Sequence, residues 1–340
     1  MLPYNLDISV TVSLTSYPAR IKVVPEVIKS IFNQTVKPDR VLLWLAEEQF
    51  SEKEASLPAE LRALKNQGLE IMWCDDLRPH KKYFYTMQKY PDDIIITVDD
   101  DVKYKPDTIE KLLASYIKFP FAVSALRAHC ITFDENGCIN PYRSWARSIN
   151  TPHFPSHALM ATGVSGVLYP PHCFGQEAFN KDFIIENCLN ADDLWLKTME
   201  LIHNIPVVLA APSDGATTIE GSQAEALFKS NDREGGNDIQ LRNILNSYDS
   251  YCGSRYTLTD RIRISSASFI SSDFKEREDS ALQIHKLKTE LNKIKGSFAY
   301  RLSLVFAFIP HSIKTFCDCI RDNGLKYTVK LLLKKLGIRL

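Results

Sequence analysis

The stretch IIITVDDDVKYKP, residues 94–106, sets three consecutive acids directly behind a run of β-branched residues. Residues 94–98 show no polar alternation, which is typical of a strand covered on both faces, as in a parallel sheet. Asp99, Asp100 and Asp101 then fall at the carboxyl end of that strand, where open α/β sheets place their ligands. This stretch therefore predicts a class of fold and the sheet edge at which a site should lie.

The three acids are suited to a cation. In an extended chain side chains alternate, so we expect Asp99 and Asp101 to point one way and Asp100 the other. Two carboxylates on one side form a hard oxygen site for Mg²⁺ or Mn²⁺, with phosphate oxygens completing the shell. A solvated acidic turn ahead of a helix is the alternative, and the buried strand in front of the acids weighs against it.

Strands and helices alternate through the first 120 residues. Besides residues 94–98, the expected strands are residues 8–14, 41–45 and 69–73. The helices between them include one with Pro25 in its first turn, one over residues 56–68, and one that Asp107 and Glu110 begin as a capping box. Alternation of this kind predicts an α/β fold with a doubly wound, mostly parallel sheet.

After residue 120 the pattern changes. Residues 121–125 and 166–169 are expected strands, and the long loops between them contain Arg143, Trp145 and Arg147. Loops of this length in a compact domain are more often functional than idle. Beyond them we expect a helix over residues 192–203, a strand over residues 207–210, and a flexible loop over residues 215–236 with its hinge at Gly235 and Gly236.

Composition is that of an ordinary globular protein. The 340 residues are 45% hydrophobic and 24% charged, and their zero net charge gives no support for a nucleic-acid partner. The eight cysteines lack zinc-site spacing, and residues 1–9 show no basic region before an apolar core, so we expect reduced thiols and a cytoplasmic location. No apolar run reaches the ~18 residues that would span a bilayer.

Charge is distributed unevenly along the chain. Residues 281–340 carry 12 Lys and Arg against 3 Asp and Glu, which leaves 29 against 38 for residues 1–280. An acidic body with a basic tail suggests a tail that meets an anionic surface. We therefore divide the chain into a main domain, residues 1–250, and a C-terminal helical appendage, residues 251–340.

The tail carries two further patterns. Apolar residues recur at heptad-like spacing at Ile284, Leu287, Leu291 and Ile294, which predicts self-association into a homo-oligomer through residues 281–296. Residues 298–309 are apolar with Arg301 embedded, and residues 326–339 mix leucines with basic residues. Such segments suit an anionic membrane surface, as in a peripheral protein on the inner face of the cell membrane. The alternative is packing on the body or a partner, with solvated lysines.

Several pieces of the sequence occur in an order that resembles a known family. The first strand ends in TSYPAR (residues 15–20), the third ends near Asp75, and the DDD stretch follows the fourth. GVSGVLYPP (residues 163–171) and ADDLWLK (residues 191–197) come later. This order, over roughly residues 8–245, resembles the GT-A fold glycosyltransferases and is closest to bacterial family 2-like enzymes that build capsule or lipopolysaccharide sugars.

The resemblance implies that residues 1–250 form a GT-A type nucleotide-sugar-binding and catalytic domain, and that its activity builds a polysaccharide. The reaction would move a hexose from a nucleotide-diphosphate sugar, with uridine as the base, to a hydroxyl of a glycan or lipid-linked glycan. Mn²⁺ or Mg²⁺ would be the cofactor and would stabilise the leaving diphosphate. One displacement would invert the anomeric centre, as in the inverting members of the family, whereas other GT-A enzymes retain its configuration.

The resemblance also implies roles for individual residues. Those that would bind the nucleotide sugar are Thr15, Tyr17, Arg20, Asp75, Lys81, Lys82, Asp99, Asp100, Gly163, Ser165 and Gly166. Those that would hold the metal are Asp101 and Asp99. Asp193, with Asp192 beside it, would be the general base that takes the proton of the acceptor hydroxyl.

More specific roles follow within this set. Asp75 would accept a hydrogen bond from the base or ribose, and Lys81 and Lys82, in a flexible stretch with His80, would approach the diphosphate. The glycines of residues 163–166 would let donor and acceptor approach the backbone closely.

Each role has a structural alternative. Tyr17 could be a packed turn residue, Lys81 a solvated surface lysine, and the glycine loop an ordinary turn before a strand. Asp192 could cap the helix that it begins, with Asp193 interacting favourably with the helix dipole.

The sequence departs from the family pattern in two places. Residues 213–245 contain no histidine to serve as a third metal ligand. The oxygen ligands that could replace it are Asn231, Asp232, Asn237 and Asp238, or else the diphosphate and Asp101 hold the metal alone. The acidic pair reads Asp-Asp where the family has Glu-Asp.

Two other classes of protein remain open. A metal-dependent nucleotidyltransferase also uses paired aspartates at a strand end, but the N-terminus has no Gly-rich basic signature to clamp a triphosphate. The other class is a non-catalytic scaffold that binds a sugar or nucleotide through a degenerate GT-A domain.

Overall fold

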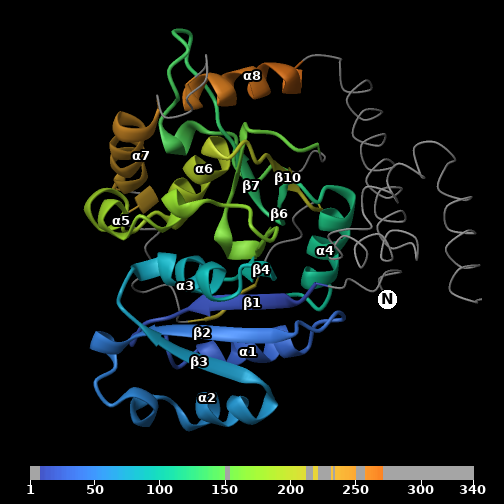
Figure 1. Cartoon of the computed structure of the whole chain (residues 1–340), viewed down its shortest axis with the longest axis vertical. Coiled ribbons are helices and arrows are strands. Elements are labelled where there is room, and N and C mark those ends of the chain that lie inside the picture. Colours follow the sequence, from blue (N-terminus) through green and yellow to red (C-terminus); the bar gives the residue numbers. More distant parts are fainter. Residues whose placement is uncertain are drawn as a thin grey trace, which may run out of the picture. The chain divides into compact units, whose positions relative to one another are not determined.

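The computed structural model describes residues 8–149, 154–211, 217–220, 231–232, 234–249 and 257–270 (Figure 1). Contacts divide the chain into two units, Met1–Phe274 and Lys275–Leu340, and every element below belongs to the first. The predicted oligomer segment and the basic tail lie outside the described residues, as does most of the predicted loop at residues 215–236. The predicted boundary at residue 250 stays a prediction.

The described residues form a central seven-stranded sheet in the order β10-β6-β9-β4-β1-β2-β3. Its strands are β1 (Val10–Thr15), β2 (Arg40–Ala46), β3 (Leu69–Cys74), β4 (Ile94–Thr97), β6 (Val123–Ala125), β9 (Val167–Tyr169) and β10 (Val207–Leu209). Neighbours pair in parallel except β9, which runs antiparallel to β4 and β6. The predicted α/β fold with a mostly parallel sheet is confirmed.

Helices cover both faces of the sheet. Along β4, Ile95 joins the apolar layer that includes α3 (Lys81–Lys89) and α6 (Asp192–Ile202). Ile94 and Ile96 join the opposite layer, which includes α1 (Val24–Phe32), α2 (Ala59–Ala63) and α4 (Thr108–Lys118). All three isoleucines are buried, as expected of a strand without polar alternation. The sheet is therefore doubly wound, as predicted.

The chain changes direction across the sheet between β1 and β4. β2 and β3 follow on one side of β1, whereas β4 joins its other side. The loops after β1 and β4 therefore diverge and leave a crevice at the carboxyl ends of these strands, the usual ligand position in open α/β sheets. The three acids follow β4 at this edge.

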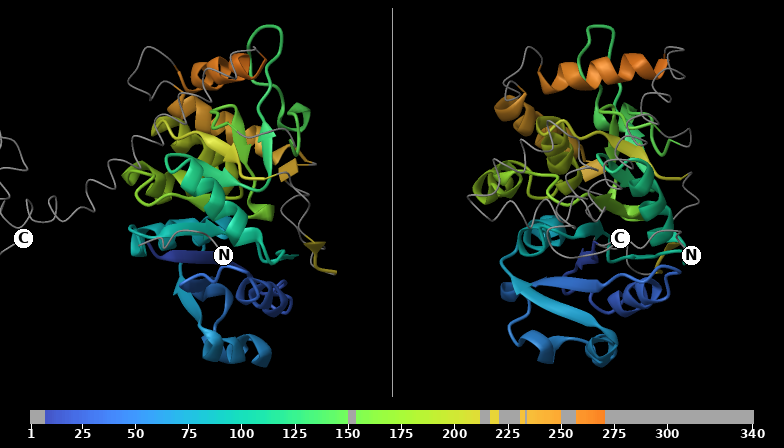
Figure 2. Two further views of the ribbon diagram at one scale, coloured as in Figure 1. Left: turned by 90° about the vertical axis from the view of Figure 1, so that its right-hand side faces the viewer. Right: turned by 45° about the vertical axis from the view of Figure 1, so that its right-hand side comes forward.

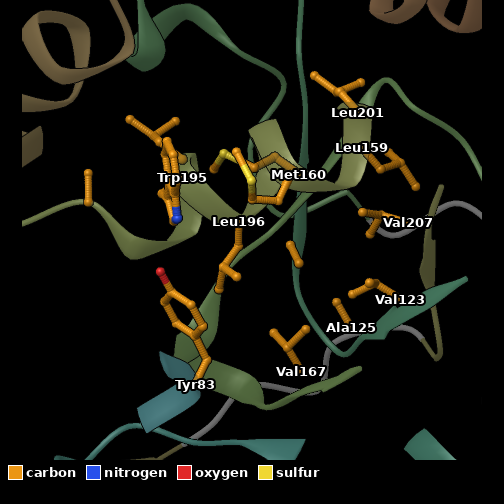
Figure 3. Packing of buried hydrophobic residues seen from close by; sticks show 14 of the residues in the cluster. Tyr83, Val123, Ala125, Leu159, Met160, Val167, Trp195, Leu196, Leu201 and Val207 are labelled. Atoms are coloured by element: carbon orange, nitrogen blue, oxygen red, sulfur yellow. The ribbon is translucent and has the colours of Figure 1, made fainter. Parts of the chain in front are cut away.

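Trp195 anchors α6 against the sheet. Its ring is fully buried and stacks on Phe183, and its Nε1 donates to the carbonyl oxygen of Ala178 at 3.0 Å. Figure 3 shows Trp195 in one apolar layer with Tyr83 from α3 and Val167 from β9. Because these contacts hold the helix, they also fix the position of its first turn, which carries the acidic pair.

Three more helices gather around α6, away from β2 and β3 (Figures 1 and 2). They are α5 (Lys181–Asn187), α7 (Gly236–Tyr248) and α8 (Leu258–Ile270). Tyr248 of α7 packs edge-on against Trp195, and Arg261 of α8 donates to the carbonyl oxygen of Leu201 at 2.6 Å. Among all described helices, none is both long and apolar enough to cross a membrane.

Two short strand pairs complete the described elements. β5 (Val102–Lys103) pairs with β11 (Thr217–Thr218), and β7 (Ala128–Cys130) pairs with β8 (Leu159–Ala161), both antiparallel. The second pair replaces part of what the sequence predicted as long loops.

The predicted capping box at the start of α4 is wrong. Asp107 precedes the helix but makes no side-chain capping hydrogen bond, and its carboxylate pairs with Lys111 at 2.9 Å. Gln34 caps the N-terminus of α4 instead, because its Oε1 accepts a hydrogen bond from the N–H of Ile109 at 3.0 Å. A side chain 75 residues away has thus replaced the local cap.

Candidate active site

A pocket of about 610 Å³ lies at the carboxyl ends of β1 and β4. The predicted site residues that line it are Thr15, Tyr17, Arg20, Lys81, Lys82, Asp99, Asp100, Asp101, Gly163, Asp192 and Asp193. Three predicted residues lie outside the lining, namely Asp75, Ser165 and Gly166. The fold thus brings the acids after β4 and the acidic pair of α6 to one cavity, although more than 90 residues separate them in the sequence.

Two of the three acids share one arginine. Arg20 Nη1 lies 2.8 Å from Asp100 Oδ1 and 3.1 Å from Asp101 Oδ2. Asp99 contacts a different cation, Lys82, so the expected alternation of the three side chains is wrong, whereas the assignment of Asp99 and Asp101 to one metal ion stays a prediction. The reason is that β4 ends at Thr97 and the acids lie in the turn that follows, where the alternation of an extended chain no longer holds.

Lys82 joins the two acidic clusters. Its Nζ lies 2.7 Å from Asp99 Oδ1 and 3.1 Å from Asp192 Oδ2, and the lysine is buried. Burial lowers the pKa of Lys82, but the charges of Asp192 and Asp99 outweigh it and hold the pKa well above its usual value. Lys82 is therefore a fixed positive charge between the acids after β4 and those of α6.

The predicted flexible stretch around Lys82 is wrong. His80, Lys81 and Lys82 are all buried, His80 in a 3₁₀ turn and both lysines in the first turn of α3. His80 Nε2 lies 2.9 Å from the carbonyl oxygen of Cys188, and Lys81 Nζ donates to Asp76 at 2.5 Å. The lysines are thus held by acids and are not solvated.

The acids of the α6 pair have different environments. Burial raises the pKa of Asp192, but Lys82 outweighs this effect and leaves the pKa below its usual value. Burial and then the charges of Asp192 and Asp99 raise the pKa of Asp193 well above its usual value. Asp192 makes no side-chain capping hydrogen bond at the start of α6. Asp192 is therefore the ionised partner of Lys82, and Asp193 has the higher proton affinity.

Gly163 lies where the clusters meet. Its N–H donates to Asp193 Oδ2 at 3.3 Å, and a Cβ on this residue would come within 3.1 Å of both Asp99 Oδ1 and Lys82 Nζ. A side chain at this position would therefore push the charged groups apart. Gly166 has a φ of 98°, a left-handed conformation that glycine adopts readily.

Tyr104 ties the acidic turn to the glycine loop. Its hydroxyl accepts from the N–H of Asp99 at 2.7 Å and donates to the carbonyl oxygen of Val164 at 3.3 Å. The sequence analysis assigned no role to this tyrosine. Tyr104 directly follows β5, and nothing in this position predicts that its hydroxyl turns back toward the acids.

The other predicted nucleotide-binding residues divide into two groups. Thr15 donates to the carbonyl oxygen of Trp44 at 2.8 Å, and the Tyr17 ring lies 5.6 Å from the Arg20 guanidinium, both at the pocket. Asp75 instead lies outside the pocket lining, and its side chain is 74% exposed and paired with Lys181 at 2.5 Å.

The far side of the pocket contains residues to which the sequence analysis gave no role in binding. They include Arg127, His129, Tyr142, Arg147 and Asn190. Burial, and then the charges of Arg127 and Arg147, lower the pKa of His129 to about 4, so this imidazole is neutral at physiological pH. In the sequence, the only indication that this part of the chain contributes to the pocket was the length of the loops after residue 125, which predicted a function for them.

The acidic turn fits a divalent cation in part. Asp99 and Asp101 offer the hard oxygen donors that Mg²⁺ and Mn²⁺ prefer. No group of three His, Cys, Asp or Glu side chains in the described part of the chain is arranged to hold a metal ion. A cation bound here would therefore take further ligands from a nucleotide and would compete with Arg20 and Lys82 for the carboxylates.

The residues considered as third metal ligands have other partners. Asn231 donates to the carbonyl oxygen of Asn190 at 2.5 Å, and Asp232 pairs with Arg147 at 3.0 Å. Asp238 accepts from the N–H of Tyr142 at 2.7 Å. Asn237 is buried at the pocket wall.

No protein-family model matches the sequence, and no curated protein matches it. Similar solved structures include a mannosyltransferase from Pyrobaculum calidifontis with GDP-Man and Mn²⁺, at 12% identity over 98% of this chain and 91% of that one, with a TM-score of 0.47. S. aureus TarS in complex with UDP is 11% identical over 70% of this chain and 66% of its own, with a TM-score of 0.38.

A third similar structure is glucosyl-3-phosphoglycerate synthase from Mycobacterium tuberculosis with Mn²⁺, UDP and phosphoglyceric acid. It shares 14% identity over 35% of this chain and 43% of its own, with a TM-score of 0.27. We draw nothing about function from likeness at these levels, and the proposals below rest on the geometry of the pocket.

Proposed function

We propose that this chain is a glycosyltransferase that moves a sugar from a nucleotide-diphosphate sugar to a hydroxyl acceptor. One observation supports this most directly: a single pocket at the switch point of the sheet contains both the acids after β4 and the acidic pair of α6, and Lys82 contacts Asp99 of the first and Asp192 of the second. Paired acids at a strand end suit a metal-bound diphosphate, and a carboxylate with raised proton affinity suits a general base.

The nucleotide-sugar donor would bind at the side of the pocket formed by the residues that follow β1 and β4. Asp99 and Asp101 would hold a Mg²⁺ or Mn²⁺ ion, which when bound supplies positive charge for the leaving diphosphate. Tyr17, beside the end of β1, is placed to contact the base or ribose. Arg20 and Lys82, now paired with acids, can turn to phosphate oxygens once the cation takes their carboxylates.

Asp193 is proposed as the general base. As the acceptor oxygen forms its bond to the anomeric carbon, the bond from that carbon to the diphosphate breaks and the hydroxyl proton passes to Asp193. The N–H of Gly163 orients the receiving carboxylate. One displacement of this kind inverts the anomeric centre, and a positioned base contributes about 10²–10⁴-fold to the rate.

Finer assignments rest on the sequence resemblance alone. They are uridine as the base, a glycan or lipid-linked glycan as the acceptor, and a role in capsule or lipopolysaccharide synthesis at the membrane. The nucleotidyltransferase and the non-catalytic scaffold remain the competing functions, and the products of the reaction separate them. Glycosyl transfer releases a nucleoside diphosphate, nucleotidyl transfer releases pyrophosphate, and a scaffold releases neither.

Thermal denaturation with nucleoside diphosphates and nucleotide sugars, with and without Mn²⁺, tests the donor site. A ligand at 100 times its Kd adds about 2.7 kcal/mol to the free energy of unfolding, which gives a readable rise in Tm. We expect one nucleotide to stabilise the wild type only with Mn²⁺, and Asp101→Asn to lose this effect.

Asp182→Asn is the matched control, because Asp182 is an exposed acid on α5 outside the pocket. It should keep the full nucleotide response. Failure of every nucleotide to raise the Tm of the wild type would argue against the donor site and favour the scaffold.

A further inference from the structure

The cationic side chains that line the pocket differ in whether they have a carboxylate partner. Lys81, Lys82, Arg20 and Arg78 each lie within ion-pair distance of a carboxylate, and Arg147 pairs with Asp232 at 3.0 Å. Arg127 lines the same pocket, but among the described residues no carboxylate lies within ion-pair distance of its guanidinium.

The hydrogen bonds of Arg127 go to neutral groups. Nε donates to Ser148 Oγ at 3.0 Å, and Nη1 lies 3.5 Å from Thr162 Oγ1. The side chain is only partly exposed, and burial lowers the pKa of Arg127 from its usual value. A guanidinium that is removed from water without a counter-ion is costly, so a partner anion would bring a net gain.

The charged residues near Arg127 also favour binding of an anion. Arg143 and Arg147 share one carboxylate, Asp232, at 4.0 Å and 3.0 Å. His129 adds no charge at physiological pH, because burial and the charges of Arg127 and Arg147 lower its pKa to about 4. Among the described residues, Arg127 and Arg147 therefore have one carboxylate in ion-pair contact, Asp232, while the charges of Asp193 and Asp99 act on Arg127 from farther away.

The position of Arg127 relates it to the reacting centre. Its carbonyl oxygen accepts from the N–H of Thr162 at 3.0 Å, and the next residue, Gly163, donates to the carboxylate of Asp193. Arg127 is therefore held one residue away from the loop that orients the proposed base. The diphosphate is expected at the other cluster, where Asp99 and Asp101 lie.

We infer that Arg127, supported by Arg147, forms a binding subsite for an anionic group of the acceptor, a phosphate or a carboxylate carried near the hydroxyl that reacts. The inference rests on the proposed glycosyl transfer. The planar fork of a guanidinium binds both phosphate and carboxylate through paired hydrogen bonds, so the two share one recognition chemistry.

Binding of glucose, glucuronate and glucose 6-phosphate to the full chain tests this subsite, because the three probes differ only at the sixth carbon. Calorimetry is carried out with Mn²⁺ and a saturating concentration of the nucleoside diphosphate that gives the largest thermal shift. We expect one or both anions to bind at least about tenfold more tightly than glucose, since a hydrogen bond to a charged group contributes about 1.5–3 kcal/mol. The anion that binds more tightly identifies the group.

Arg127→Met should remove the preference for the anion, and Arg127→Lys should keep part of it. Arg62→Met is the matched control, because Arg62 is an exposed arginine of α2 outside the pocket. Equal binding of glucose and both anions, or an unchanged preference in Arg127→Met, would overturn the subsite.

Competition between ligands separates this inference from the proposed function. If the nucleoside diphosphate displaces the anion, Arg127 serves the donor diphosphate and the acceptor subsite is refuted while donor binding stands. If no nucleotide binds, the proposed function fails, and the assignment of Arg127 to an acceptor fails with it.

Discussion

Two buried lysines contact acids of α6, and their pKa values move in opposite directions. Lys82, at the pocket, lies within 3.1 Å of Asp99 and Asp192, whose charges outweigh the effect of burial and raise its pKa. Lys197, in the core, has a single carboxylate partner, Glu200, at 3.1 Å. Burial there prevails, lowering the pKa of Lys197 and raising that of Glu200 to about 7.

The difference comes from the number of carboxylates around each ammonium group. With two acids in contact and Asp193 nearby, Lys82 stays ionised and keeps like charges together before any ligand is bound. With one acid, burial outweighs the attraction within the core pair and shifts the pKa of each group toward its neutral form. Persistent charge is therefore concentrated at the pocket, where a function can use it.

Asp193→Asn should produce the largest loss of activity. It removes the acid of the α6 pair whose pKa stays raised despite the charge of Lys82, and which we propose as the general base. We expect transfer to fall about 10²–10⁴-fold, measured as nucleoside diphosphate release, while nucleotide binding is kept. The stability should not fall, since the pKa of Asp193 is raised by burial and by Asp192 and Asp99. Full activity in this variant would refute the proposed base and favour a scaffold.

Asp192→Asn is the comparison for this variant. Asp192 is the ionised partner of Lys82, so its loss should lower the free energy of unfolding as well as activity. Equal stability losses in both variants would contradict the different environments assigned to the two acids.

Lys82→Met should be the most destabilising change at the pocket. It leaves Asp99 and Asp192 without their shared cation, and breaking a buried pair by removing one partner costs about 3–5 kcal/mol. Urea denaturation measures this loss. Part of it should be recovered at low pH, where the orphaned carboxylates are protonated, and a loss independent of pH would argue against the electrostatic role.

The fold was largely predictable because its signals are local. The unbroken β-branched run of residues 94–98 and the alternation of strands with helices sufficed for the parallel sheet, and the first turn of α6 was placed correctly at Asp192. Such patterns depend on backbone period and burial, which each segment carries in its own sequence.

The site was less predictable because its contacts join distant segments. Lys82 was expected on a flexible stretch, yet it is buried between acids 17 residues away on one side and far along the chain on the other. Arg127 and Tyr104 gave no local signal, since neither belongs to a motif. Which partner a charged side chain finds is decided by tertiary packing.

The core pair should make stability depend on pH in a predictable direction. The pKa of Glu200 is raised from 4.5 to about 7, so the folded state binds more protons between these values. The stability from this group is fully present below about pH 4.5 and is lost as pH rises through about 7, with a slope of at most ~1.4 kcal/mol per pH unit.

The double variant Lys197→Met, Glu200→Gln removes this contribution, and the difference between its urea titration curve and that of the wild type isolates the pair. At neutral pH the double variant should be about as stable as the wild type, because replacing a buried pair often costs little. A difference curve that rises with pH in this range would contradict the direction of the Glu200 shift.

Tyr104→Phe should produce the smallest effect, because it changes no charge. It removes the hydroxyl that accepts from the N–H of Asp99 and donates to the carbonyl oxygen of Val164. Leaving these groups without a partner should cost about 1–2 kcal/mol of stability. Nucleotide affinity should also fall, because the acidic turn is no longer tied to the glycine loop, while the pH dependence of unfolding stays that of the wild type. A changed pH dependence would mean that Tyr104 also affects the ionisation of the groups around Lys82, which we attribute to the carboxylates alone.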